Sequence, residues 1–506
     1  MSVHATSTAL AAAAQRPAAN RMLIAATVML GMIMAIIDAT IVNVALPTIA
    51  GNLGASIDDA AWVATGYLLS AVVIMPLNGW LTAYFGRKNF YAACIAIFTI
   101  ASLLCGTATS IWQLTFYRVI QGIGGGALQP TAQALLFEVF PPKERGGAMA
   151  LFGLGAMVGP AIGPLLGGYI VDNATWPLIF FINIPIGILA FIMTLAFIPN
   201  PHYLNKPKGG LDFIGLGLLV AGLASLQYVL ERGQHDDWWS SSTITVLAVV
   251  SIVALTVFIV KSLRDRHPLV DLHVFRYREF TIGNVLLAIL GFGLFGTALI
   301  MPLFFQSIAG MTAYDTGVVL LPGAIATAVS MLIVGRMVGR FDGRILIAIG
   351  VALFATSTWM LGGLNENTGY WDVFYPRVLQ GFALGFLFVP LTTVMLAPIP
   401  REELAGASGV SNLVRQIGGS LGIALLTTLL ARKTALAWSV LAGGVTHAHG
   451  IPIGTLTGLV AQSSSVIAYN YLFRLTAVVF VATLPFVFFM RPPRNVQASA
   501  TPALAE

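Results

Sequence analysis

Asp38 lies within a long apolar segment, where a carboxylate is costly to bury. The segment runs from Met22 to about Ala45, and roughly 20 apolar residues span a bilayer as a helix. The other acidic residues fall in loops, in tails or near the ends of apolar segments, and every histidine falls outside these segments. Cysteine and tyrosine titrate well above neutral pH. Asp38 is therefore the residue predicted to bind and release a proton within the membrane.

Arg118 is the predicted partner of Asp38. Asp38 precedes the end of the first predicted span by about eight residues, and Arg118 follows the start of the fourth by about seven, so at ~1.5 Å per residue both lie roughly 10–12 Å below the same membrane surface. A carboxyl group that moves between an apolar environment and the vicinity of a cation changes its affinity for protons. Two interpretations stay open: a proton-coupling pair, or a static ion pair that only fixes helix packing.

The composition indicates that membrane helices position these residues. The chain has 506 residues, of which 57% are hydrophobic and 9% are charged, whereas soluble proteins carry about a quarter charged residues. Fourteen long apolar segments lie between residues 22 and 490, which predicts an all-α membrane protein. The basic residues that give the net charge of +6 are scattered in short loops. This distribution is typical of membrane topology signals rather than of nucleic-acid binding.

The chain contains an internal repeat. "FYRVIQGIGGG" (Phe116–Gly126) matches "YPRVLQGFALG" (Tyr375–Gly385), so that Arg377 and Gln380 are counterparts of Arg118 and Gln121 at an offset of 259 residues (from 118 to 377). The repeat predicts two six-helix bundles. Two similar halves suit a transporter that moves about a site at the membrane midplane. Arg377 has no acidic residue at comparable depth, so we expect proton chemistry in the first half alone.

The repeat and the apolar segments together define the domains that we expect. They are a cytoplasmic tail at 1–20, a first bundle at 21–200, two inserted transmembrane helices at 201–266, a second bundle at 267–490 and a cytoplasmic tail at 491–506. Residues 434–470 are expected to form an amphipathic hairpin loop outside the cytoplasm. Most Lys and Arg residues outside the spans fall on the side of the N-terminus, so both termini are expected in the cytoplasm.

A glycine-rich stretch, "GLGAMVGPAIGPLLGGYI" (Gly153–Ile170), is the most specific motif. Its glycines recur every four residues and share one helix face, and two prolines interrupt the backbone hydrogen bonds nearby; these residues are Gly155, Gly159, Gly163, Gly167, Pro160 and Pro164. One interpretation is close helix packing. The other is a smooth, bendable helix along which a partner helix slides. The two interpretations are compatible.

The substrate-contacting residues are less clear from the sequence. Met34, Ile41 and Val42 share the helix face of Asp38, and Phe292 and Phe295 could line the second half, with Gln306 beyond the outer end of their span. Arg377, Gln380 and Arg415 are a separate group, the second-half counterparts of the first-half motif residues. The spans hold more arginines than acids, which favours lipophilic compounds that are neutral or weakly acidic.

Several motifs resemble those of the major facilitator superfamily. "GAMVGPAIGPLLGG" resembles its antiporter motif and "RVIQGIGGG" its fourth-helix motif. "IDATIVNVALP" (Ile37–Pro47) resembles the first-helix motif of the fourteen-span drug/proton antiporter family of the EmrB/QacA type, as do "WPLIFFINIPIG" (Trp176–Gly187) and "RQIGGSLGIALL" (Arg415–Leu426). The loop "GWLTAYFGRK" departs from the superfamily pattern, because Ala83 replaces the usual acid. In its counterpart, Gly339 stands at that position and Asp342 follows three residues later.

The resemblance implies a major facilitator fold with two extra central helices, in the bacterial inner membrane, and proton-driven export of lipophilic drugs or toxic compounds. It also allows a partnership with a periplasmic adaptor protein and an outer-membrane channel. We expect no metal or cofactor other than the coupling proton. A transporter for one metabolite or siderophore is the alternative. An intramembrane enzyme or a receptor is disfavoured, because no nucleophile–base pair or phosphate loop is visible in the spans.

Overall fold

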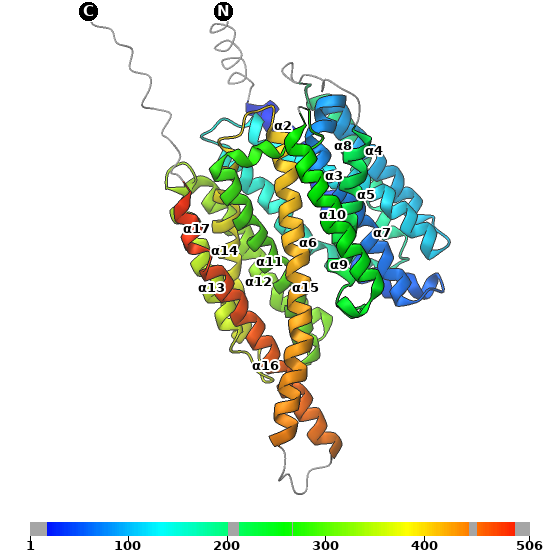
Figure 1. Cartoon of the computed structure of the whole chain (residues 1–506), viewed down its shortest axis with the longest axis vertical. Helices are drawn as coiled ribbons and strands as arrows, with labels where there is room; N and C mark the ends of the chain where they lie inside the picture. The colour runs from blue at the N-terminus through cyan, green and yellow to red at the C-terminus, as the bar shows by residue number, and fades with distance from the viewer. Residues whose placement is uncertain (1–17, 201–211, 266, 445–452, 491–506) are drawn as a thin grey trace, which may run out of the picture.

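The computed structural model describes residues 18–200, 212–265, 267–444 and 453–490, which form helices joined by short loops (Figure 1). The expected tails, apart from residues 18–20, lie outside the described residues. The helices of the first half are α2 (Ala18–Asn52), α3 (Ile57–Phe85), α4 (Arg87–Gly106), α5 (Ile111–Val139), α6 (Arg145–Asn173), α7 (Leu178–Phe181) and α8 (Asn183–Phe197). The central helices are α9 (Phe213–Arg232), η1 (Trp238–Ser240) and α10 (Ser242–Arg264). The second half contains η2 (Leu272–Arg276), α11 (Arg278–Ser307), α12 (Ala313–Met337), α13 (Gly343–Leu361), α14 (Tyr370–Leu396), α15 (Leu404–Gly444), α16 (Ile453–Val481) and α17 (Leu484–Phe489).

The sequence marks where several helices begin. The side chains of Ser56, Ser110 and Thr312 accept hydrogen bonds from the first free backbone N–H groups of α3, α5 and α12. Asp315 completes a capping box at α12. These caps satisfy donors that a helix leaves unpaired at its start, and they place the turns between spans at the ends of the apolar segments.

The described residues contain fourteen crossings. Thirteen helical segments in the described residues are long and apolar enough to span a membrane, with α7–α8 and α16–α17 each counted as one. The fourteenth crossing is α5, which is 29 residues long and carries the buried polar residues Arg118, Gln121 and Gln133. The predicted all-α architecture of two six-helix bundles with two extra central helices is confirmed.

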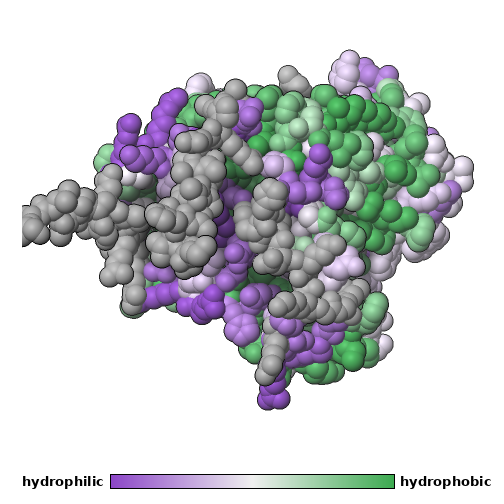
Figure 2. All heavy atoms as spheres, turned by 90° about the horizontal axis from the view of Figure 1, so that it is seen from above, coloured by the Kyte–Doolittle hydropathy of each residue, from purple (hydrophilic) through white to green (hydrophobic). Residues whose placement is uncertain are grey.

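We call the end at which α2 begins and α17 ends the terminal end, and the opposite end the hairpin end (Figure 1). At the terminal end the bundles touch backbone to backbone, because a Cβ atom added to Gly79 of α3 would lie 2.7 Å from the Cα atom of Gly406 in α15. A Cβ atom added to Gly146 of α6 would lie 2.7 Å from the backbone oxygen of Gly335 in α12. Hydrophilic residues gather on the terminal face (Figure 2). The structure is therefore closed at the terminal end.

Residues 434–470 differ from the expected loop. Their described part continues α15 to Gly444 and begins α16 at Ile453, so two long helices project from the hairpin end (Figure 1). Residues 445–452 lie outside the described part. The extension of α15 is rich in alanine and leucine, which favour helix. The described part of this segment is therefore helix rather than loop.

Helix α9 contacts both bundles. The Gln227 amide donates a hydrogen bond to Ser420 of α15 at 2.8 Å, and the ring of Tyr228 lies 5.6 Å from that of Trp62 in α3. The inserted helices therefore pack against the junction between α3 and α15, with α10 on α9.

Candidate functional site

Asp38 lies in the middle of α2 and is fully buried inside the first bundle, at 0% exposure. Its Oδ2 atom accepts a hydrogen bond from Nη1 of Arg118 at 2.5 Å. Its Oδ1 atom accepts from the side-chain amides of Gln121 at 3.0 Å and Asn183 at 2.7 Å. The structure thus brings together the pair that helix depth predicted, and it adds two amide donors.

The Arg118 guanidinium is held from several sides. Its Nε atom donates to the backbone oxygen of Val63 in α3 at 3.2 Å, and Nη1 also donates to Oε1 of Gln121 at 2.7 Å. Its central carbon lies 4.3 Å from the ring centroid of Tyr67. A buried charge is tolerated when it is paired and hydrogen-bonded, and both members of this pair meet that condition.

Two polar residues of the site were not identified as site residues from the sequence. Gln121 was noted only as a repeat position, and Asn183 only as part of a motif. Asn183 begins α8 and connects Asp38 to Ser102, since its amide also donates to the Ser102 hydroxyl at 3.0 Å. The available signal was that each is a polar side chain within an apolar segment, which in a membrane needs a hydrogen-bonding partner.

The glycine face of α6 packs on α2, beside Asp38. A Cβ atom added to any of its four motif glycines would lie within 2.9 Å of a residue of α2. The distances are 2.5 Å from Gly155 to Met32, 2.6 Å from Gly159 to Ile36, 2.0 Å from Gly163 to Oγ1 of Thr40 and 2.9 Å from Gly167 to Ile41. Pro160 and Pro164 lie inside the helix. Close packing of this face is therefore observed, and sliding along it stays a prediction.

The predicted substrate residues are not brought together. Met34 lies in the main core, and Ile41 and Val42 lie in a separate apolar cluster of the first bundle with Trp176. Phe292 and Phe295 are half-buried, and Gln306 is exposed. The ring of Phe295 lies against the backbone of Gly419 in α15.

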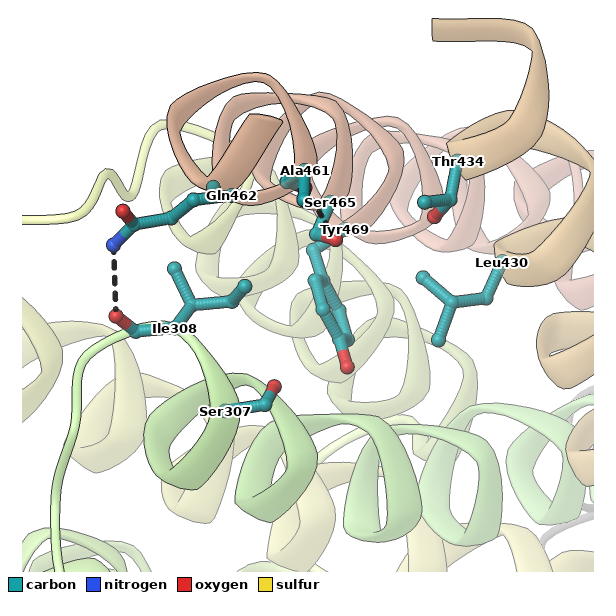
Figure 3. A pocket seen from close by; sticks show the side chains of 9 residues that line it. Ser307, Ile308, Leu430, Thr434, Ala461, Gln462, Ser465 and Tyr469 are labelled. Carbon is teal, nitrogen blue, oxygen red and sulfur yellow. Dashed lines mark hydrogen bonds between the residues drawn. The ribbon is translucent and has the colours of Figure 1, made fainter. Parts of the chain in front are cut away.

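A cavity of about 550 Å³ lies at the hairpin end, between α11, α15 and α16. Ser307, Leu430 and Tyr469 line it, and the Gln462 amide donates to the backbone oxygen of Ile308 at its edge (Figure 3). The predicted residue Gln306 directly precedes Ser307 in the sequence, but it does not line this cavity.

The second-half arginines lie in different places. Arg377 on α14 donates to Gln380 of the same helix. Arg415 on α15 is buried, at 5% exposure, and donates to Oδ1 of Asn412 at 3.2 Å. Neither forms an ion pair within the described part of the chain.

Hydrogen bonds close the terminal end where the usual motif acid is missing. The Asn78 amide of α3 donates to the backbone oxygen of Ala405 at 2.9 Å, and its oxygen accepts from the Thr131 hydroxyl at 2.6 Å. The Asn412 amide of α15 donates to Oε1 of Gln133 in α5 at 2.7 Å. We call these five residues the polar latch. Asp342, the nearby acid in the second half, pairs instead with its neighbour Arg344.

Comparison with known proteins places this architecture in a family. Residues 28–423 match the model of the Major Facilitator Superfamily. The chain is 35% identical to the multidrug export protein EmrB of Escherichia coli, over 95% of this chain and 97% of the relative. It is 33% identical to the fatty acid resistance protein FarB of Neisseria gonorrhoeae, over 92% and 95% of the two chains.

A solved structure supports the same fold. The proton:xylose symporter XylE superimposes with a TM-score of 0.63 over 94% of this chain and 97% of that chain, at 13% sequence identity. Together with the repeat and the fourteen crossings, these matches show that the chain belongs to the major facilitator superfamily of transporters and, within it, to the family of the EmrB multidrug export proteins.

Proposed function

We propose that this protein exports lipophilic compounds from the cytoplasm in exchange for protons. The observation that carries the proposal is the fully buried Asp38–Arg118 pair with its amide donors. The relatives support the direction and the breadth of transport, because one is named for multidrug export and another for resistance to fatty acids. The compounds we expect are lipophilic and neutral or weakly acidic.

The positive residues support an orientation. Arg87, Lys88, Arg276, Arg340 and Arg401 lie at the terminal end, and cytoplasmic loops carry the excess of Lys and Arg in membrane proteins. We therefore place the terminal end and both chain termini in the cytoplasm of a bacterial inner membrane. With that orientation, the structure is closed toward the cytoplasm.

The transport cycle then requires the pair to open. In this conformation the side chain of Asp38 is fully buried, and both of its carboxylate oxygens accept hydrogen bonds. Protonation of Asp38 from outside would remove the charge that holds Arg118, and deprotonation toward the cytoplasm would restore it. Each proton that enters at 100 mV supplies about 2.3 kcal/mol. Sliding of α2 on the glycine face of α6 is the motion we propose for this switch.

The projecting ends of α15 and α16 would lie outside the inner membrane in this orientation. We propose that they form the surface on which a periplasmic adaptor and, through it, an outer-membrane channel assemble. The transport step itself rests on residues inside the two bundles.

A toxicity screen in a host without its own pumps tests the proposal. The native chain, Asp38→Asn and a control, Asp342→Asn, are expressed at equal levels and challenged with a panel of lipophilic poisons. The native chain and the control are expected to protect against several compounds, and Asp38→Asn against none. Equal protection by Asp38→Asn would exclude the proton role of Asp38, and no protection by the native chain would count against export.

A further inference from the structure

The repeat relates the Asp38 site to an equivalent place in the second half. The offset of 259 that joins Arg118 to Arg377 also joins Ile49-Ala50-Gly51 to Ile308-Ala309-Gly310, so it holds along α2 and α11. At this offset Asp38 corresponds to Thr297, and Tyr67 corresponds to Ala326. The second half therefore keeps the arginine but lacks both the acid and the aromatic ring that cover it in the first half.

The hydrogen bonds show that the correspondence is geometric. In the first half, Arg118 donates to Oε1 of Gln121, and Nε2 of Gln121 donates to Asp38 at 3.0 Å. In the second half, Arg377 donates to Oε1 of Gln380, and Nε2 of Gln380 donates to the hydroxyl of Thr297 at 3.5 Å. The same arginine–glutamine arrangement thus points at a hydroxyl where the first half has a carboxylate.

Arg377 lacks the acceptors that satisfy Arg118. Its remaining contact through Nη1 is the sulfur of Met301 at 3.5 Å. Its Nε atom is buried without a hydrogen-bond partner among the described residues, whereas Nε of Arg118 donates to a backbone oxygen. Gln380 and Thr297 are each 2% exposed. Arg377 itself is half-buried, and a partly buried cation without an acidic partner is costly unless an anion reaches it.

We propose that Arg377, Gln380 and Thr297 form a binding site for the anionic head of an exported amphiphile, with a carboxylate as the matching chemistry. The carboxylate would take the place that Asp38 occupies in the first half. It would accept hydrogen bonds from the guanidinium and from the Gln380 amide, beside Thr297, whose hydroxyl donates to the backbone oxygen of Gly293 at 2.6 Å. Charge-assisted bonds of this kind are the stronger ones. The inference rests on the proposed function, because it names the class of compound that the exporter carries.

Matched ligands test the site on the full-length protein in lipid nanodiscs. Equilibrium binding is measured for radiolabelled dodecanoate, dodecanol and dodecylammonium, which share a tail and differ in charge, and for acetate, which has the head without the tail; empty nanodiscs give the background. The native protein is expected to bind dodecanoate more tightly than the other three. Equal binding of dodecanol or dodecylammonium would overturn the proposal. Equal binding of acetate would show a site for small anions and would overturn the claim that the ligand is an amphiphile.

Two substitutions locate the site. Arg377→Gln removes the cation, and Thr297→Asp supplies the missing acid from the protein itself, which rebuilds the first-half pair. Each is expected to lower the ratio of dodecanoate to dodecanol affinity by at least about tenfold, which corresponds to ~1.4 kcal/mol. Arg474→Gln, which removes an exposed arginine on α16, is the control and should keep the native ratio.

Arg377→Gln and Thr297→Asp together also separate a failure to fold from a failure of the proposal. If Arg377→Gln does not fold, Thr297→Asp decides the question, because it fills the site and gives the half-buried arginine an acidic partner. A native ratio in Thr297→Asp would overturn the proposal. Proton-driven transport by the native protein is measured separately in liposomes, and its absence would count against the proposed function without bearing on the binding result.

Discussion

Substitution of Asn412 by alanine should open the terminal end. Asn412 makes three side-chain hydrogen bonds, but those with Ser408 and Arg415 lie within α15 and persist whether the bundles are together or apart. The bond to Gln133 at 2.7 Å joins the two bundles and exists only when the terminal end is closed. Of the three bonds, this one therefore bears on the balance between conformations, together with the Asn78–Ala405 bond of the same latch.

The expected size follows from the burial of Gln133, which is 2% exposed. Leaving a buried acceptor without its donor costs about 1–3 kcal/mol, and every ~1.4 kcal/mol changes an equilibrium tenfold. Asn412→Ala should thus favour the open terminal end by about five- to 150-fold. Substituting Gln133 and Asn412 together should shift the balance less, because removing both partners leaves no unpaired acceptor.

Spin labels at Lys143 and Glu402, exposed residues at the terminal end of the two bundles, report the change as a distance distribution in lipid. The label–label distance should grow in Asn412→Ala. Asn470→Ala is the control, because it removes a hydrogen bond from a half-buried asparagine to the backbone oxygen of Leu364, which lies within the second bundle. An unchanged distribution in Asn412→Ala, or an equal shift in the control, would refute the role of the latch.

Three further predictions concern stability and pH. Asn183→Leu removes one hydrogen bond from buried Asp38 and should lower the free energy of unfolding by about 1–3 kcal/mol; an unchanged melting temperature would contradict this. Gly163→Leu should destabilise the protein by about 1–3 kcal/mol, because its Cβ atom would lie 2.0 Å from Oγ1 of Thr40. Gly168→Ala is the control and should not destabilise it, because nothing lies within 4 Å of an added Cβ atom there. Equal melting temperatures for the two variants would argue against tight α2–α6 packing. The hydrogen bond to Asp236 raises the pKa of His235, with a smaller contribution from Asp58 at 3.2 Å. Because the folded pKa is the higher one, the contact between the α9–α10 loop and α3 should be strongest below about pH 6.5 and weaken as the pH rises through the raised value. Hydrogen exchange of residues 233–241 measures this, and the same pH dependence in His235→Gln would refute it.

The sequence predicted the Asp38–Arg118 pair because long helices run nearly straight across a membrane, so residue counts convert directly into depth. The same argument could not find Asn183, since depth alone does not say that α8 packs beside α2. The contacts of the predicted substrate residues stay a prediction. Met34, Ile41 and Val42 share a helix face with Asp38, but their neighbours in the bundle cover that face completely.

The closure of the terminal end could not be predicted from its motif. Ala83 replaces the usual acid, and the structure uses Asn78 with the backbone oxygen of Ala405 instead. A backbone acceptor has no sequence signature, so the substitute becomes visible only when α3 and α15 are placed together. The length of α15 was missed because polar and apolar residues mix in its outer part, although their helix propensity is high.

Movement of protons against substrate tests the central claim most directly. Liposomes that contain the protein and a pH-sensitive dye receive an exported compound on one side, with no imposed pH or voltage difference. The account predicts that flow of the compound drives protons in the opposite direction with the native chain, and that Asp38→Asn moves none. Compound flow without proton movement in the native chain, or equal proton movement in Asp38→Asn, would contradict it.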